Sequence, residues 1–76
     1  MDIPPFVHNL LPDKSITHYK IDTYRDDIDR ENSGYLVTYQ YLYIYFTEDD
    51  KHMEAFFYRE NRDPFRLEKM ICLDDN

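Results

Sequence analysis

The stretch from Tyr35 to Phe46 alternates without a break between two kinds of side chain. Tyrosines and a valine fill the odd positions, and mostly aliphatic or small polar residues fill the even ones. Aromatic and β-branched residues at a period of two predict a β-strand. This stretch is roughly twice as long as a usual strand. It must lie inside a sheet, because an exposed edge of this length would pair with other chains. We expect a bulge or a strong twist along it.

Two shorter segments, 16–24 and 53–59, alternate in the same way on either side of this stretch. Polar connections at 25–34 and 47–52 separate the three, and Gly34 gives the first connection a position where positive φ has no steric cost. Sequential strands joined by polar turns usually pair with each other. The sequence therefore predicts an antiparallel meander.

The N-terminal segment predicts a short helix. Prolines at positions 4 and 5 suit a first helical turn, and Pro12 would end it. Phe6 and Leu10 would share one face, with Val7 and Leu11 beside them. We expect this helix to lie against the sheet as a lid, with an extended arm as the alternative.

The C-terminal segment 65–73 fits two structures. As a strand it places several apolar residues on one side; as a helix it has Asp63 as N-cap and Pro64 as first residue. The strand is favoured. The fold class is then mainly β, one antiparallel sheet of three to four strands in meander order with a short N-terminal helical segment, and α+β is the alternative. We expect one domain over 1–76, with a lid at 1–15, the sheet at 16–73 and a tail at 74–76.

The alternation also assigns the two faces of the sheet. Leu36, Leu42, Ile44 and Phe46 are expected to form the core, and the tyrosines to lie on the less buried side. Cys72 is expected to be a small core residue.

Charge and composition restrict the class of partner and the compartment. The net charge is −7, with 16 acidic against 9 basic residues, which argues against direct nucleic-acid binding because that requires a basic surface. A single cysteine fits a reducing compartment, and no apolar run approaches the ~20 residues that cross a bilayer. We expect a cytoplasmic protein without membrane contact.

The motifs of catalysis and metal binding are missing from the sequence. Asp27, Asp29 and Glu31 alternate as calcium ligands do, but the positions that need glycine and glutamate hold Asn32 and Thr38. The three histidines are scattered, and no glycine-rich loop is present to hold a phosphate. We expect no cofactor, no metal site, no catalytic residue and no enzymatic activity.

The tyrosines of the central strand are the candidate binding residues. They can lie at the edge of a core, where their rings are buried and their hydroxyls reach solvent. Alternatively, they can anchor a protein interface, where tyrosine is enriched. Acidic residues flank them along the sequence at both ends. The predicted partner-binding set is Tyr39, Tyr41, Tyr43, Tyr45, Asp26, Asp27, Asp29, Glu31, Glu48, Asp49 and Asp50.

An aromatic centre with an acidic rim predicts binding to a basic protein. We expect the chain to block that partner, and the carboxylates and flat rings could also stand for the phosphates and bases of nucleic acid. In size, acidity, β content and its single cysteine alone, the chain resembles phage-encoded inhibitors, toxin immunity proteins and antitoxins, and this resemblance assigns no residue. The alternative is a module that sequesters a small ligand or nucleotide. Its only plausible cations are Lys20, Arg25, Arg59 and Arg66.

The oligomeric state follows from the coverage of the sheet. The N-terminal segment can cover one face, which leaves the tyrosine side bare. The sequence favours a two-fold dimer through that side, with a monomer as the alternative because two chains of charge −7 repel each other.

Overall fold

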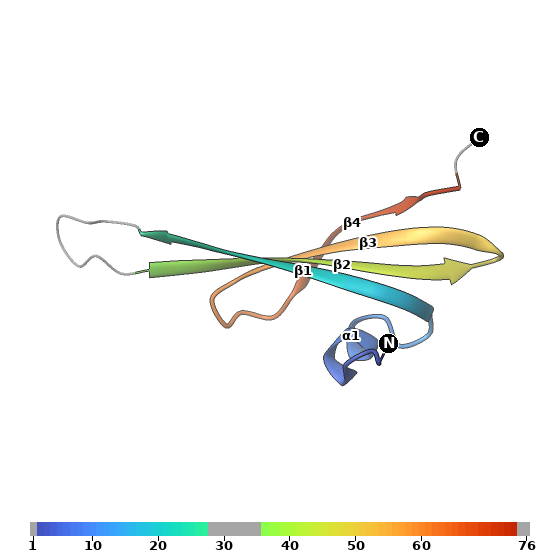
Figure 1. The fold of residues 1–76 in the computed structure, drawn as a ribbon, viewed down its shortest axis with the longest axis horizontal. Coiled ribbons are helices and arrows are strands. Elements are labelled where there is room, and N and C mark those ends of the chain that lie inside the picture. Colours follow the sequence, from blue (N-terminus) through green and yellow to red (C-terminus); the bar gives the residue numbers. More distant parts are fainter. Residues whose placement is uncertain (1, 28–35, 75–76) are drawn as a thin grey trace.

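The protein is a four-stranded antiparallel sheet with one short helix (Figure 1). The computed structural model describes residues 2–27 and 36–74. The strand order is β1-β2-β3-β4, so each strand pairs with its neighbour in sequence. The predicted mainly β meander is confirmed, and the C-terminal segment is a strand rather than a helix. The elements are α1 Pro5–Leu10, β1 Ser15–Asp27, β2 Leu36–Glu48, β3 Lys51–Glu60 and β4 Arg66–Cys72.

The first two strands are longer than the alternation predicted. Arg25, Asp26 and Asp27 were assigned to a connection, but they continue β1 opposite Thr38, Val37 and Leu36 of β2. The backbones of β1 and β2 therefore remain paired over these three residues, although their side chains on β1 are charged. Asp29 and Glu31 lie outside the described residues.

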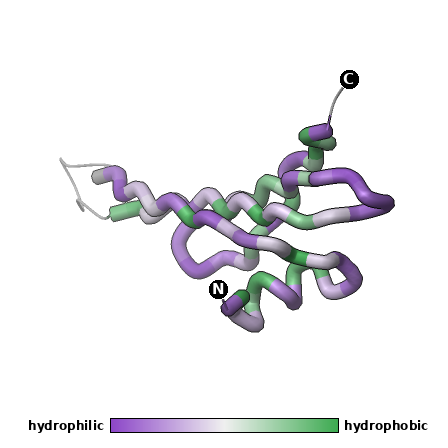
Figure 2. The backbone as a smooth tube through the Cα atoms, turned by 45° about the vertical axis from the view of Figure 1, so that its right-hand side comes forward, coloured by the Kyte–Doolittle hydropathy of each residue, from purple (hydrophilic) through white to green (hydrophobic). Residues whose placement is uncertain are grey.

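The β2–β3 connection is shorter than predicted. Only Asp49 and Asp50 form the turn, and Glu48 pairs directly with Lys51. Both turn residues have positive φ, 53° and 63°, as in the two-residue turns whose twist matches that of a hairpin. This turn is the strongly hydrophilic right-hand end of the sheet in Figure 2.

The turn gives the first testable prediction. Asp50→Gly should raise the free energy of unfolding by about 0.5–1 kcal/mol, because glycine adopts positive φ without the Cβ clash of other residues. Urea denaturation measures the change. Asp50→Ala is the matched control and should lower stability, since alanine lacks the local hydrogen bonding that lets aspartate tolerate this region. A glycine variant no more stable than the alanine variant would contradict the turn geometry.

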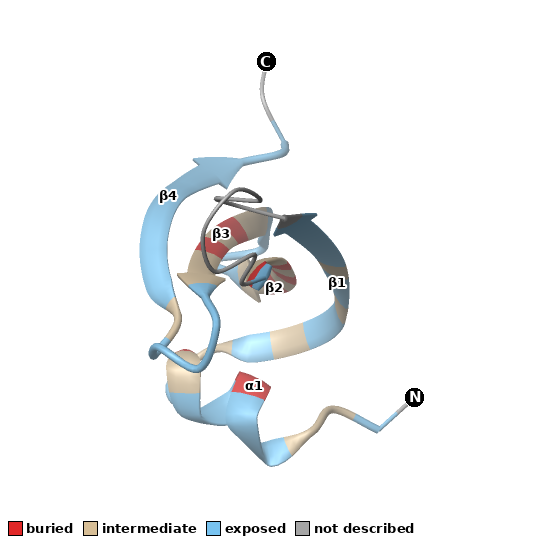
Figure 3. Ribbon diagram, turned by 90° about the vertical axis from the view of Figure 1, so that its left-hand side faces the viewer, coloured by how far each residue is buried: buried red, intermediate tan, exposed pale blue. Residues whose placement is uncertain are grey.

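The core lies between α1 and one face of the sheet. Pro5 opens the helix, and the backbone N–H groups of Val7 and His8 donate to the carbonyl oxygen of Pro4. Val7 and Leu11 are the buried residues of this segment, whereas Phe6 is 42% exposed. In Figure 3, α1 lies below the strands, and the buried segments are in α1 and the central strands. The buried cluster consists of Val7, Leu11, Leu42, Ile44, Phe46, Ala55 and Phe57.

Two residues predicted for the core are exposed. Leu36 is 53% exposed because β3 pairs with β2 only as far as Tyr39, so β1 is the one described strand beside Leu36. Cys72 is exposed because it ends β4, an edge strand on which every residue is exposed. Both predictions were wrong for one reason: burial depends on where the neighbouring elements end.

The second prediction compares two leucines of β2 with the same strand parity. Leu42→Ala should destabilise the protein by about 2–5 kcal/mol, because Leu42 is fully buried and its removal leaves a cavity. Leu36→Ala should change stability by less than about 0.5 kcal/mol, as surface substitutions usually do. Chemical denaturation of both variants measures the difference. Equal losses would show that the core extends to Leu36.

The register irregularities lie in the edge strands rather than in the long central strand. In β1 the register shifts between Ile16 and His18, where the Thr17 hydroxyl donates to the carbonyl of Tyr45 at 3.1 Å. A second shift occurs where β3 meets β4. Bulges of this kind twist an edge and discourage pairing with another chain. No helix in the described residues is long and apolar enough to span a membrane.

Candidate interaction face

The side of the sheet opposite the core carries aromatic rings from three strands. Directly paired residues point to the same face, so Tyr24 of β1 joins Tyr39, while Tyr58 and Phe56 of β3 join Tyr41 and Tyr43. We call this surface the tyrosine face. Its rings are Tyr24, Tyr39, Tyr41, Tyr43, Tyr45, Phe56 and Tyr58.

Tyr41 is the centre of this ring layer. Its ring stacks on Phe56 with centroids 5.7 Å apart, tilts against Tyr58 at 5.2 Å, and meets Tyr24 edge-on at 5.7 Å. The ring of Tyr43 also lies against Phe56, tilted, with centroids 5.0 Å apart. Such pairs contribute about 0.5–1.5 kcal/mol each beyond their buried area. The rings therefore stabilise the sheet through one another and hold fixed positions.

No helix of the described chain covers the tyrosine face. The one helix, α1, packs on the core side through Val7. The rings of β2 and β3 are consequently only partly buried, and Tyr24 is 54% exposed. This agrees with the prediction that the tyrosines occupy the less buried side.

Charged side chains lie among the rings. The ammonium of Lys20 is 5.6 Å from the centroid of the Tyr43 ring and 3.8 Å from a carboxylate oxygen of Asp22. His18 stacks on Tyr45 with centroids 4.3 Å apart. The face thus already holds one cation between an aromatic ring and a carboxylate.

Two tyrosines of the face are close to glutamates. Tyr58 donates a hydrogen bond to Glu60 at 2.9 Å. The hydrogen bond to Glu54, followed by burial, raises the pKa of Tyr45 to about 12. Desolvation, followed by the hydrogen bond to Glu60, raises the pKa of Tyr58 to about 12. Both hydroxyls remain neutral donors that hold carboxylates within the ring layer.

The acidic residues selected from the sequence are dispersed. Asp26 pairs with Val37 and belongs to the tyrosine face, and Asp27 is described only as part of β1. Asp49 and Asp50 lie in the turn beyond the end of the face. Glu48 is bound to Lys14, whose ammonium is 2.6 Å from its carboxylate.

The acids that accompany the rings were mostly missed. They are Asp22, Glu54 and Glu60, which pair with Tyr41, Tyr45 and Tyr39. The alternation of β3 contained this information, because Glu54 and Glu60 have the same parity as Phe56 and Tyr58. The predicted acids instead lie in and beside the connections that flank the tyrosines along the sequence.

The cations required by the small-ligand alternative do not converge. Lys20 and Arg66 share the tyrosine face but lie on opposite edge strands, β1 and β4. Arg59 pairs with Gln40 on the core side, so the sheet separates it from both. Arg25 lies towards the far end of β1, opposite Thr38. Within residues 2–27 and 36–74, no three histidine, cysteine or acidic side chains are placed to hold a metal ion.

Comparisons with known proteins gave no match to a family model, to a curated protein or to a solved structure.

The third prediction concerns the hydroxyl of Tyr45. Its folded pKa of about 12 exceeds the ordinary 10.0, so its contribution to stability is complete below pH 10 and is lost as the pH rises from 10 to 12. Glu54→Gln should lower this pKa, because an amide does not repel the phenolate. Ultraviolet absorbance of tyrosinate against pH measures it.

Asp49→Asn is the matched control, since it removes the same charge in the turn and should leave the titration curve unchanged. An unchanged curve for Glu54→Gln would show that Glu54 does not act on Tyr45.

Proposed function

We propose that the protein binds a basic partner protein through the tyrosine face and blocks the surface that it covers. The observation that supports this most strongly is the ring layer itself. Seven aromatic side chains from three strands lie side by side, and α1 covers only the opposite side. Exposed apolar surface of a few hundred Å² is typical of interaction sites.

The rings are suited to binding because they are already ordered. Tyr41 is held by three ring contacts and Tyr58 by its hydrogen bond to Glu60. A side chain that is fixed before binding loses little conformational entropy when a partner covers it. Partly buried tyrosines can then act as anchors for the partner.

The charge of the whole chain favours a basic partner. It is −7, and Asp22, Glu54 and Glu60 lie among the rings. Arg66 and Lys69 of β4 pair with Tyr58 and Phe56, so the described cations of this face lie on its two edge strands. Lys20 shows within the molecule how a cation is accommodated, over the Tyr43 ring and beside Asp22. Arginines of a partner could use the same combination, since guanidinium stacks on aromatic rings and pairs with carboxylates. A partner surface of this kind would itself bind anions, so covering it would inhibit the partner.

The fourth prediction tests this face with a matched pair of variants. Tyr41→Glu should abolish capture of the partner from a lysate of the source organism, because it places a charge at the centre of the ring layer. Leu67→Glu adds the same charge at a side chain that is 50% exposed and pairs with Phe57 on the core side, so it should retain the partner. The purified partner should lose activity with the wild type and keep it with Tyr41→Glu.

Salt and sedimentation complete this test. Capture should weaken between roughly 0.1 and 1 M salt, as the screening length falls from about 10 Å to 3 Å. Capture that is equally strong at low and high salt would contradict the proposal, and so would capture by both variants. Sedimentation of the wild type, Tyr41→Glu and Tyr43→Glu at micromolar concentration distinguishes a second copy: a wild-type dimer that both variants dissociate would show that the face binds itself.

A further inference from the structure

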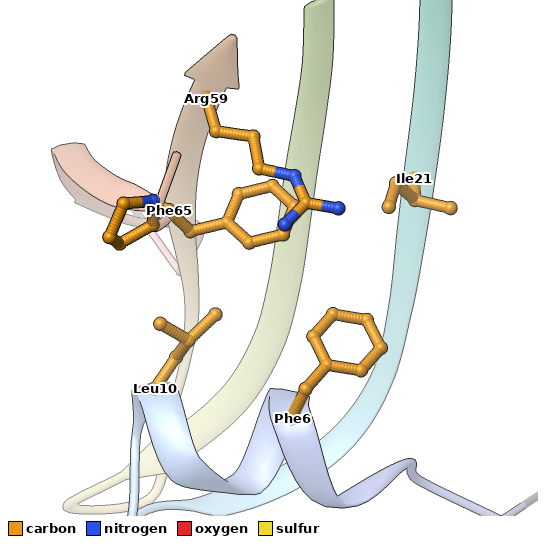
Figure 4. A pocket seen from close by; sticks show the side chains of 6 residues that line it. Phe6, Leu10, Ile21, Arg59 and Phe65 are labelled. Atoms are coloured by element: carbon orange, nitrogen blue, oxygen red, sulfur yellow. The ribbon is translucent and has the colours of Figure 1, made fainter. Parts of the chain in front are cut away.

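The core side of the sheet holds a pocket that is separate from the tyrosine face. Its volume is about 330 Å³, and it lies where α1, β1 and the end of β3 meet (Figure 4). The walls are almost entirely apolar, and one side chain among them is charged. The lining residues are Phe6, Leu10, Ile21, Arg59, Pro64 and Phe65.

The charged residue, Arg59, is held in place by a chain of contacts across three strands. Its Nε donates to Oε1 of Gln40 at 2.6 Å, and Nε2 of Gln40 donates to the hydroxyl of Thr23 at 3.2 Å. Its guanidinium carbon also lies 4.4 Å from the centroid of the Phe65 ring. The guanidinium therefore has a fixed orientation before any ligand arrives.

The charge of Arg59 is not balanced by an ion pair within the part of the chain that the structure describes. The ion pairs there join Lys14 with Glu48, Lys20 with Asp22 and His52 with Asp74. The hydrogen bond to Gln40 uses Nε, which leaves the N–H groups of the terminal nitrogens for a further acceptor. A carboxylate suits these groups best, because guanidinium can bind it in a planar, bidentate manner.

The rest of the pocket offers apolar contact. Phe6 and Phe65 lie nearly parallel, 6.2 Å apart, and Leu10 lies beside them on α1. Phe6 is 42% and Ile21 37% exposed, so each still presents apolar area to water. A ligand that covered them would gain hydrophobic free energy in proportion to the area removed from water.

We propose that this pocket binds an amphipathic monocarboxylate, a small organic acid with one carboxylate and an apolar chain or ring. The carboxylate pairs with the terminal nitrogens of Arg59, and the apolar body lies against Phe6, Leu10 and Ile21. The proposal does not depend on the tyrosine face, which is on the other side of the sheet.

The charge balance selects this class over other anions. The chain as a whole carries −7, and this repulsion acts more strongly on a dianion such as phosphate than on a monocarboxylate. One guanidinium offsets a single negative charge. Acetate carries a single negative charge but has no apolar chain to fill the pocket. Because the walls of the pocket are mostly apolar, we expect apolar contact to supply most of the affinity.

Octanoate is the probe for the test, titrated into the ¹⁵N-labelled full chain and followed by NMR. We expect saturable shifts at the pocket residues, including the Nε–H signal of Arg59. Octanol, which lacks the charge, should bind at least about tenfold more weakly, because a charge-assisted pair is worth a tenfold change or more. Acetate, which lacks the apolar chain, should also bind at least about tenfold more weakly, because it removes little apolar area of the pocket from water. Shifts that do not saturate, or equal binding of octanol, would overturn the proposal.

Arg59→Gln and Arg66→Gln form the matched pair of variants. Both remove one positive charge, but Arg66 pairs with Tyr58 and is not part of the pocket. Arg59→Gln should weaken octanoate binding at least about tenfold, and Arg66→Gln should change it less than about twofold. If Arg59→Gln does not fold, Ile21→Glu keeps Arg59 and places a competing carboxylate in the pocket, with the same expected loss. Octanoate binding unchanged in the folded variant would show that Arg59 is not its ligand.

Discussion

The fold depends on β2 having a strand on each side of it. Its backbone is paired with β1 from Leu36 to Thr47 and with β3 from Tyr39 to Glu48. Both of its faces carry large apolar or aromatic side chains, so both require contact with other side chains. The two neighbouring strands pair with the backbone N–H and C=O groups of β2, but they cannot cover its two faces. The two faces are covered differently.

One face is covered by a helix and the other mainly by its own rings. A helix of only six residues contributes Val7 to one buried cluster with Leu42, Ile44 and Phe46, and Leu11 belongs to the same cluster. On the other side, Tyr41 and its aromatic neighbours shield each other, and no helix of the described residues lies over them. Lateral ring packing stabilises the sheet and still leaves ring area for another molecule. Stability and the proposed binding would therefore depend on the same side chains, which is why the binding tests require variants that remain folded.

The sequence predicted the features that depend on local pattern. A period of two identified the first three strands, because alternation is a property of neighbouring residues, and it only favoured a strand over a helix for the fourth. It could not show that Leu36 is exposed, because that depends on β3 ending at Glu60, a residue far away in sequence. The position of Arg59 was equally inaccessible: Gln40, Phe65 and α1 define its surroundings, and the fold brings these elements together. The acids near the rings were only partly predictable from the sequence. The parity of Glu54 and Glu60 within β3 is a local pattern, but the pairing of β3 with β2 is what places them beside the rings.

Three of the described cations lie close to aromatic rings, which bears on how the acidic charge remains effective. Lys14 lies 5.9 Å from the Phe46 ring, Lys20 lies over Tyr43, and Arg59 lies over Phe65. Each is held partly by an aromatic ring, and rings do not neutralise charge. Only Lys14 and Lys20 among these also pair with a carboxylate. With 16 acids against 9 bases, most carboxylates cannot be paired internally. The negative potential therefore extends into solvent, where it would attract the basic partner that we propose, while Arg59 provides a local exception inside its pocket.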